Sequence, residues 1–243
     1  MANLIVEADL IANYLSGVKL TDQNGVALPD SLFDTAIINA VAWFSMTHKV
    51  FIAPEIIEDE QHDYYVEQYQ DYCYIALYHY PVLSVQSVQA IYPTGQSIMI
   101  FPQPWVKLRK KAGQIQLIPT AGTLSQVLIG QGGNWLPLMG RLNSLPSLFH
   151  VSYTAGFDTG KVPDIVNAII GMKAAIHVMN NSTVLNPGIQ SQSIGEDGLS
   201  QTMSVMGGKY GPYSGRINSY NEQIQELVNT LMAEYRGIPF TVI

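Results

Sequence analysis

The run from Leu148 to Met179 constrains the fold most, because it predicts a strand, a turn and a helix without interruption. In Leu148–Tyr153, large apolar side chains alternate with polar ones at the two-residue period of a half-buried strand. Gly156 and the Asp158–Gly160 turn follow, and Pro163 stands where the first helical residue is expected, since its fixed φ suits that position. One helix face is then almost wholly apolar and must be covered: Val162, Ile165, Val166, Ile169, Ile170, Ile176 and Met179, with Lys173 among them.

Three further helices are predicted from the same periodicity. A short one spans Glu7–Leu15 and stops at Gly17. A stronger one opens on Pro29, Asp30 and Ser31, with Ser31 and Asp34 spaced as a capping box, and ends near Thr47. The last begins at Ser214, carries apolar residues at alternating three- and four-residue steps, and ends before Gly237.

Short extended segments fill the region between Phe51 and Tyr153, where turns rich in Gly and Pro separate candidate strands. These strands are 72–80, 86–92, 97–101, 114–118 and 125–129. The first is apolar on both faces, which predicts a buried strand and favours packing over base stacking. A polar hairpin is predicted further on, with strands 189–194 and 199–205.

Two charged runs lie in this β-rich region. Glu58–Asp63 is the densest acidic cluster, and we interpret it as a solvated loop, because adjacent residues seldom converge on one metal ion. The alternatives are a divalent metal site using His62 and the neighbouring carboxylates, and a negative patch that repels phosphates. Arg109–Lys111 is more typical of a hairpin tip than of a nucleic-acid patch, although it could pair with an acidic neighbouring subunit.

Composition excludes several classes of function. Only 13% of the residues are charged, about half the usual share, which favours a surface covered by partner subunits over a monomer with a neutral polar surface. The net charge of −7 disfavours a DNA-reading role. One cysteine, Cys73, requires no oxidising compartment, and no apolar run approaches a membrane span. We therefore expect a protein of the cytosol or of an assembled particle, with no membrane contact.

Motifs of enzymes and cofactor sites are absent from the sequence. The Gly156–Lys161 segment is too short for a phosphate-binding loop, no Gly-x-Ser-x-Gly occurs, and the five histidines form no HExxH pair. We predict no catalytic, cofactor-binding or metal-binding residue and no enzymatic activity. Separated carboxylates could still meet in space as an acid and base pair.

Two motifs resemble a known family. The run Val151–Phe157 followed by Val162-Pro163 and an apolar helix, together with the upstream run Tyr80–Val88 (YPVLSVQSV), is similar to the head-tail connector (adaptor or neck) proteins of tailed bacteriophages. The resemblance implies an α+β fold in which an N-terminal helix pair, a central helix and a C-terminal helix pack around a mainly antiparallel β-sheet region. We divide the chain into a helical connector core (1–50 plus 148–237), a β-rich region (51–147) and an extended tail (238–243).

The resemblance also implies a function and partners. The expected role is that of a structural virion protein, made in the host cytoplasm, that forms a dodecameric ring between the portal and the tail or stopper protein. DNA is expected to pass through this ring without sequence-specific binding. By position and character, Phe240, Thr241, Val242 and Ile243 are the expected portal-binding tail. The alternatives are a stopper or tail-completion protein and, in a different class, a carbohydrate-binding or hydrolytic module on the β-rich region. This region is larger than in compact connectors and leaves the level in the neck open.

One long loop, Gly130–Pro146, has no sustained period and several large apolar residues. Such loops inside compact domains are usually functional or disordered, and the apolar residues argue against disorder. The loop either packs on a neighbouring subunit or folds over its own core. The candidate contact residues are Trp135, Leu136, Leu138 and Met139.

Overall fold

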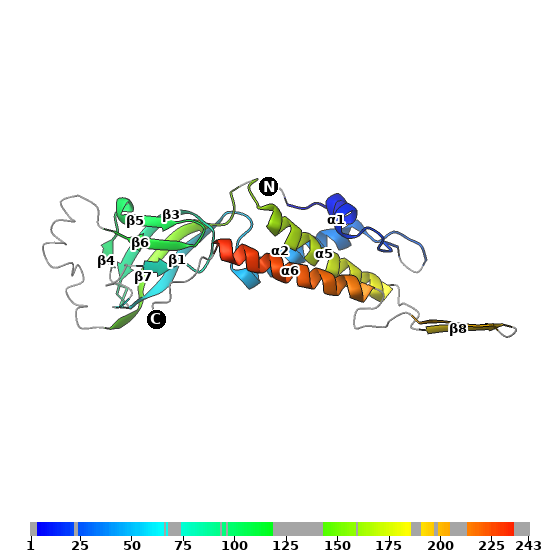
Figure 1. Cartoon of the computed structure of the whole chain (residues 1–243). Helices are drawn as coiled ribbons and strands as arrows, with labels where there is room; N and C mark the ends of the chain where they lie inside the picture. The colour runs from blue at the N-terminus through cyan, green and yellow to red at the C-terminus, as the bar shows by residue number, and fades with distance from the viewer. Residues whose placement is uncertain are drawn as a thin grey trace. The chain divides into compact units, whose positions relative to one another are not determined.

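A computed structural model of the 243-residue chain combines α-helices with antiparallel sheets, which confirms the predicted α+β class (Figure 1). The structure describes residues 4–21, 24–65, 67, 74–92, 94–95, 97–118, 143–158, 160–185, 191–196, 199–204 and 213–235. These residues divide between two compact units. A sheet unit comprises Met1–Ala2, His48–Lys161 and Ala233–Ile243, and a helical unit comprises Asn3–Thr47 and Val162–Met232.

The sheet unit contains two antiparallel sheets. The larger has the order β1-β7-β3-β4, and the smaller has the order β2-β6-β5. Their strands are β1 (Glu55–Tyr65), β2 (Tyr74–Ala76), β3 (Val82–Ile91), β4 (Ser97–Ile100), β5 (Val106–Arg109), β6 (Gln114–Leu117) and β7 (Ser144–Ala155), with a short 3-10 helix, η1 (Gln103–Trp105), before β5. The strand β7, which the sequence analysis divided between the β-rich region and the helical core, lies wholly in the sheet unit.

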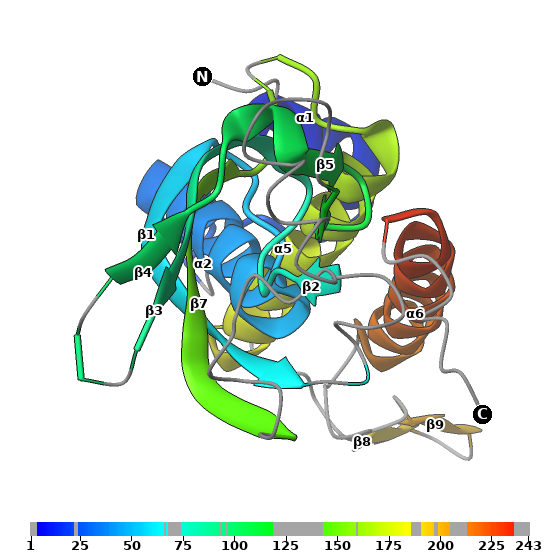
Figure 2. The ribbon, with the colours of Figure 1, turned by 90° about the vertical axis from the view of Figure 1, so that its left-hand side faces the viewer.

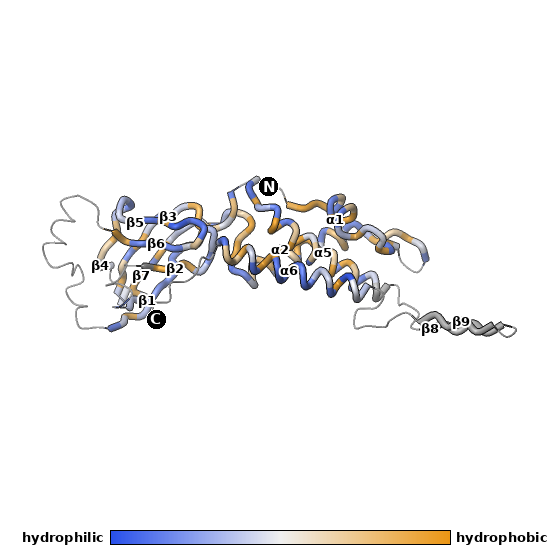
Figure 3. The backbone as a smooth tube through the Cα atoms, in the orientation of Figure 1, coloured by the Kyte–Doolittle hydropathy of each residue, from blue (hydrophilic) through white to orange (hydrophobic). Residues whose placement is uncertain are grey.

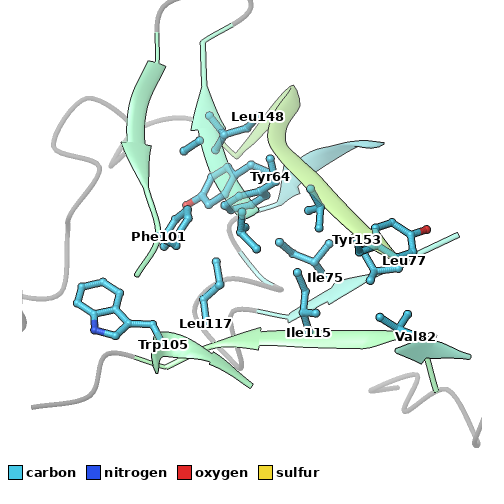
Figure 4. Packing of buried hydrophobic residues seen from close by; sticks show 14 of the residues in the cluster. Tyr64, Ile75, Leu77, Val82, Phe101, Trp105, Ile115, Leu117, Leu148 and Tyr153 are labelled. Atoms are coloured by element: carbon cyan, nitrogen blue, oxygen red, sulfur yellow. The ribbon is translucent and has the colours of Figure 1, made fainter. Parts of the chain in front are cut away.

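The core of the sheet unit lies between the two sheets. Val151, Tyr153 and Val88 from the larger sheet and Ile115 from the smaller one are fully buried in a single apolar cluster. Figure 4 shows side chains from both sheets converging there, with the hydroxyl of Tyr153 at the margin. The period-2 alternation predicted for Leu148–Tyr153 therefore holds, because one face of β7 packs on this core and the other does not.

The helical unit contains α1 (Glu7–Tyr14), α2 (Asp30–His48), α5 (Asp164–Leu185) and α6 (Ser214–Tyr235), and Figure 2 looks nearly along the last three. Buried residues occur all round α5, as in a central core helix. Gly171 lets the N-terminal segment approach closely, since a Cβ there would stand 2.6 Å from the Tyr14 ring. Lys173 lies 4.4 Å from the centre of the Trp43 ring, and this cation–π contact gives a partly buried lysine a partner.

By contrast, α6 is amphipathic, and its tube in Figure 3 alternates between hydrophilic and hydrophobic residues. Its buried side consists of Ile217, Ile224, Val228 and Leu231. None of the described helices combines the length and the apolarity that crossing a bilayer requires.

The polar hairpin predicted after the central helix is present. It consists of β8 (Ser191–Glu196) and β9 (Leu199–Ser204), which pair in antiparallel register from Ser191 with Ser204 to Glu196 with Leu199. The predicted strand 125–129 lies outside the described residues.

Three local predictions differ from the structure. Helix α2 begins at Asp30, so Ser31 lies inside the first turn and not at the N-cap. Helix α5 begins at Asp164, so Pro163 precedes the first helical residue. The Pro163 carbonyl accepts the first hydrogen bonds of the helix, from the backbone N–H groups of Val166 and Asn167. The strand predicted over 72–80 is only Tyr74–Ala76 in the described part, and it is not buried on both faces: Ile75 is buried while Ala76 is exposed.

Gly156 provides a prediction about the turn between β7 and α5. Its φ of +127° is a conformation that L side chains rarely adopt, and a Cβ there would stand 2.8 Å from the Ala53 carbonyl carbon. We expect Gly156→Ala to lower the free energy of unfolding by roughly 3 kcal/mol, combining backbone strain and overlap, measured as a lower urea midpoint.

Gly160→Ala is the matched control. Gly160 also has a positive φ, +78°, but a Cβ there would meet nothing within 4 Å. In the control, the free energy of unfolding should fall only by the contribution of backbone strain, about 1 kcal/mol. Equal losses in the two variants would contradict the role assigned to the Ala53 contact.

Candidate functional site

The acidic cluster Glu58–Asp63 is not the solvated loop that the sequence analysis favoured. It lies within β1, the edge strand that pairs with β7, and two of its residues are buried: Glu60 is 8% exposed and His62 is 7% exposed. The pairing is irregular between Ile57 and Glu60 and again between His62 and Tyr64. These bulges shift the alternation, so a run that is polar at every position still directs some side chains inward.

Glu60 is the centre of a buried polar network. Its Oε1 lies 2.7 Å from Nε2 of His62 and accepts a hydrogen bond from the Tyr78 backbone N–H at 3.0 Å. Its Oε2 accepts the hydroxyl proton of Tyr153 at 2.6 Å and lies 3.4 Å from Nδ1 of His79. The Tyr153 hydroxyl oxygen in turn accepts a hydrogen bond from the backbone N–H of His79 at 3.2 Å. One carboxylate thus joins β1, β7 and the segment that follows β2.

The electrostatics of the network favour an ionised Glu60 and a neutral Tyr153. Burial alone would raise the pKa of Glu60, but the hydrogen bonds from His62, Tyr153 and Tyr78 together hold that pKa below its ordinary value. Burial, with the carboxylate beside it, raises the pKa of Tyr153. The phenol therefore remains a donor at every physiological pH, and the carboxylate remains an acceptor.

Neither alternative use of this network, as a metal site or as catalytic machinery, gains support from the geometry. Among the described residues no group of three or more His, Cys, Asp or Glu side chains is arranged to hold a metal ion. Both oxygens of Glu60 already face protein donors, so they have little capacity left for a substrate. What the arrangement can do is fix β1 against β7, since an unpaired carboxylate at that depth would be costly.

The other acidic side chains of the cluster are exposed, and two of them stabilise the bulges through contacts with β7. Asp59, with a φ of +57°, places its Oδ1 2.6 Å from Nδ1 of His150, and Asp63 accepts the Ser147 N–H at 2.9 Å. Glu58 is exposed and forms no ion pair with another described residue. The outer face of β1 is therefore acidic, while its inner face belongs to the core.

The basic run forms the tip of the β5–β6 hairpin, as predicted. Lys107, Arg109, Lys110 and Lys111 are all exposed. Lys111 pairs with Glu234 of the same chain at 2.5 Å. Lys107, Arg109 and Lys110 make no ion pair with another described residue, so their charge is uncompensated there.

Large apolar side chains are exposed on both units. In the sheet unit they are Ile56, Tyr65, Tyr78, Ile100 and Ile118. In the helical unit they include Ile38 and Met46, which are 66% and 77% exposed on the outer face of α2. Isolated cases are ordinary, but groups beside uncompensated charges are typical of surfaces that bind another protein.

Both sets of site residues proposed from the sequence lie outside the described residues. These are the loop residues Trp135, Leu136, Leu138 and Met139 and the tail residues Phe240, Thr241, Val242 and Ile243. The sequence analysis missed the Glu60 network. A partial signal was available: His62 and Glu60 are two residues apart, the spacing that places side chains on one face of a strand.

Tyr153→Phe tests the network. Removing the hydroxyl leaves Glu60 Oε2 without its 2.6 Å donor, and we expect the free energy of unfolding to fall by about 1–3 kcal/mol, measured by urea denaturation. Tyr78→Phe is the matched control, because Tyr78 is 57% exposed and contributes only its backbone N–H to Glu60. A loss in the control as large as in Tyr153→Phe would argue against the network.

The lowered pKa of Glu60 predicts a dependence of stability on pH. A carboxyl whose pKa is lower in the folded than in the unfolded state stabilises the fold above the unfolded value, and the contribution is lost as pH falls. The wild type should therefore lose stability below the ordinary value of 4.5. Glu60→Gln should be less stable at neutral pH and should lose less between neutral and acid pH, measured as urea midpoints across that range. Parallel pH curves for the two proteins would contradict the assignment.

Comparisons with known proteins find a likeness in structure but no match in sequence to a protein family or a curated protein. A chain from the neck of an empty GTA particle, solved with C6 symmetry, is similar in structure over 93% of this chain and 94% of its own length. The two chains are 11% identical, with a TM-score of 0.36.

Proposed function

We propose that this protein is a structural component of the neck of a tailed phage or phage-like particle, where copies of it form a ring between the portal and the tail. The proposal includes no catalytic activity and no cofactor. DNA passes through the ring without sequence-specific binding. Twelve copies are expected from the resemblance to connector proteins, which places such rings beneath a portal.

The observation that carries the proposal is the spatial relation of the two connector-like motifs. The run Tyr80–Val88 contributes the start of β3, and Val151–Phe157 contains the end of β7, and these strands pair. Val85 lies opposite Tyr153, Val88 lies opposite Val151, and the Gly156 N–H donates to the Pro81 carbonyl at 2.8 Å. The two motifs, far apart in the sequence, thus form one structural unit that leads into α5. Their pairing supports the resemblance to connector proteins that both motifs carry.

Charge supports passive passage of DNA. Ten acidic and four basic residues fall in the helical unit, so this unit carries most of the net charge of −7. On α6, Glu222 and Glu226 are exposed. A surface of this sign repels phosphates, which would keep DNA from adhering to it.

Two rival functions make different predictions. A stopper or tail-completion protein would form a ring lower in the neck, and electron microscopy of the particle separates it from a portal-bound connector by position. A carbohydrate-binding or hydrolytic module would act alone, and activity in a glycan-array or hydrolase screen would favour it. The enclosure of Glu60 by protein donors supports the structural role over the hydrolytic one.

The proposal predicts a complex with portal rings. Mixed with the portal of its own particle, the protein should co-sediment as a ring of defined mass, and deletion of Phe240–Ile243 should weaken this co-sedimentation while the circular dichroism spectrum stays unchanged. The expected reason is that an uncharged, apolar tail binds by insertion into a groove or by strand addition.

The matched variant is Phe240→Asp with Val242→Asp, which keeps the tail length and removes its apolar character. It should weaken binding as the deletion does. Full co-sedimentation of both variants would reject the role of the tail. Absence of any wild-type complex with the portal would reject the neck function itself.

A further inference from the structure

The sheet unit has an acidic flank on its β1 side. We define it by Glu55 and Glu58, together with the exposed apolar residues Ile56, Tyr65 and Tyr78. Tyr78 belongs to this side because its ring lies 4.8 Å from the ring of His62 on β1. No other described strand pairs with the outer edge of β1, since β7 occupies its inner edge. Ile56 is 70% exposed and lies between the two glutamates of this flank.

A basic flank lies on the β5 side of the same unit. It consists of Lys107, Arg109 and Lys110, with Ile100 of β4 and Ile118 beyond β6 as its exposed apolar residues. The Ile118 N–H donates to the Trp105 carbonyl, which places Ile118 beside the start of β5. In the part of the chain that the structure describes, β5 pairs only with β6. Lys107, Arg109 and Lys110 share one sign of charge and form no ion pair with another residue that the structure describes.

The two flanks lie on different strands of the sheet unit, with β7 and β3 between β1 and β5. Strand β5 lies beside β3 (Figure 1), and the Gln103 side chain just before it donates to the Gln86 carbonyl of β3. Strand β1 is separated from β3 by β7. One unit thus presents negative charge with apolar side chains on its β1 flank, and positive charge with apolar side chains on its β5 flank. Among the described residues of this unit, the five large apolar side chains that are exposed all belong to these two flanks.

We infer that the acidic flank of one copy binds the basic flank of the next, so that the sheet units associate head to tail. The occupant of each flank is a second copy of this chain, because its other flank offers the opposite charge and a matching apolar group. A contact between two different flanks is heterologous, the kind from which rings are built. The inference rests on the proposed ring-forming function and assigns the surfaces that would make the ring.

The contact is made by side chains and not by a continuous intermolecular sheet. Bulges at Glu58–Asp59 and near Asp63 interrupt the β1 edge, and bulges of this kind disfavour pairing with another strand. The charges then select the partner and its orientation. The apolar residues, Tyr65 and Tyr78 above all, supply contact area that is shielded from water.

Charge reversal in the full chain tests the inference. One variant carries Glu55→Lys and Glu58→Lys, and a second carries Lys107→Glu and Arg109→Glu. At low salt each should weaken self-association by about tenfold or more, because every contact then opposes like charges. The variant with all four changes keeps the net charge and restores complementarity, so its association should return to within about threefold of the wild type. Sedimentation velocity over a concentration series measures all of these.

Glu222→Lys with Glu226→Lys is the matched control. It changes the net charge as the acidic-flank variant does, but on α6. The control should associate as the wild type does, and added salt should weaken the wild-type complex. The inference is overturned if the control loses as much as the flank variants, if the single-flank variants associate normally, or if the wild type stays a monomer at about 0.1 mM, where a contact of this class should populate oligomers.

Failure of this inference and failure of the neck function give different results. If wild-type protein binds portal rings while the flank variants associate and bind as it does, the ring uses other surfaces. If the flank variants lose self-association while wild type shows no affinity for the portal, the head-to-tail contact stands and the neck function falls. Circular dichroism of each variant confirms that the substitutions leave the fold intact.

Discussion

The pairing of β7 with β3 is the constraint on which the rest of the structure depends. Because β7 is central in its sheet, its inner face must supply core residues while its ends must connect to other elements. At one end Gly156 passes so close to Ala53 that no side chain fits, and the chain then leaves for α5. Tyr153 of β7 both fills the core and binds a neighbouring strand, since its ring is buried and its hydroxyl donates a hydrogen bond to Glu60 of β1. A β1 strand with two bulges remains in place because this hydrogen bond and the contacts of Asp59 and Asp63 tie it to β7.

Local periodicity was sufficient to predict the helices and most strands. The helices α1, α2 and α6 have boundaries within about two residues of those expected, since each combines an apolar stripe with a start or stop signal. Helix α5 starts one residue after Pro163 but continues to Leu185, beyond the apolar run that the sequence analysis followed to Met179. The hairpin β8–β9 and the β5–β6 turn were equally predictable, because turn chemistry lies in adjacent residues. The family resemblance added what periodicity lacks, namely that two separated runs belong together, and their pairing as β3 and β7 gives that resemblance a physical meaning.

The Glu60 network was beyond such prediction for a physical reason. A run of six polar residues has no apolar period, so its secondary structure is decided by partners elsewhere in the chain. Those partners, Tyr153 and His79, are distant in the sequence from Glu60, and only the folded sheet brings their hydrogen-bonding groups to its carboxylate. Bulges compound the difficulty, because each one changes which side chains face inward. The same run then provides both a buried anchor and an exposed acidic edge, two roles that composition cannot separate.

The exposed acidic edge matters for how copies of this chain would recognise one another in an assembly. A chain with few charges gains selectivity from each one, because a mismatch at a flank leaves a desolvated charge without a partner. Charges alone do not fix the angle between neighbouring copies, and a head-to-tail contact can generate either a closed ring or an open filament. Rigidity of the flanks therefore matters: the bonds that tie Asp59 and Asp63 to β7 hold the acidic edge in one shape. Under the proposed function, the portal above the growing ring would supply the remaining constraint, by accepting only the curvature that its own symmetry permits.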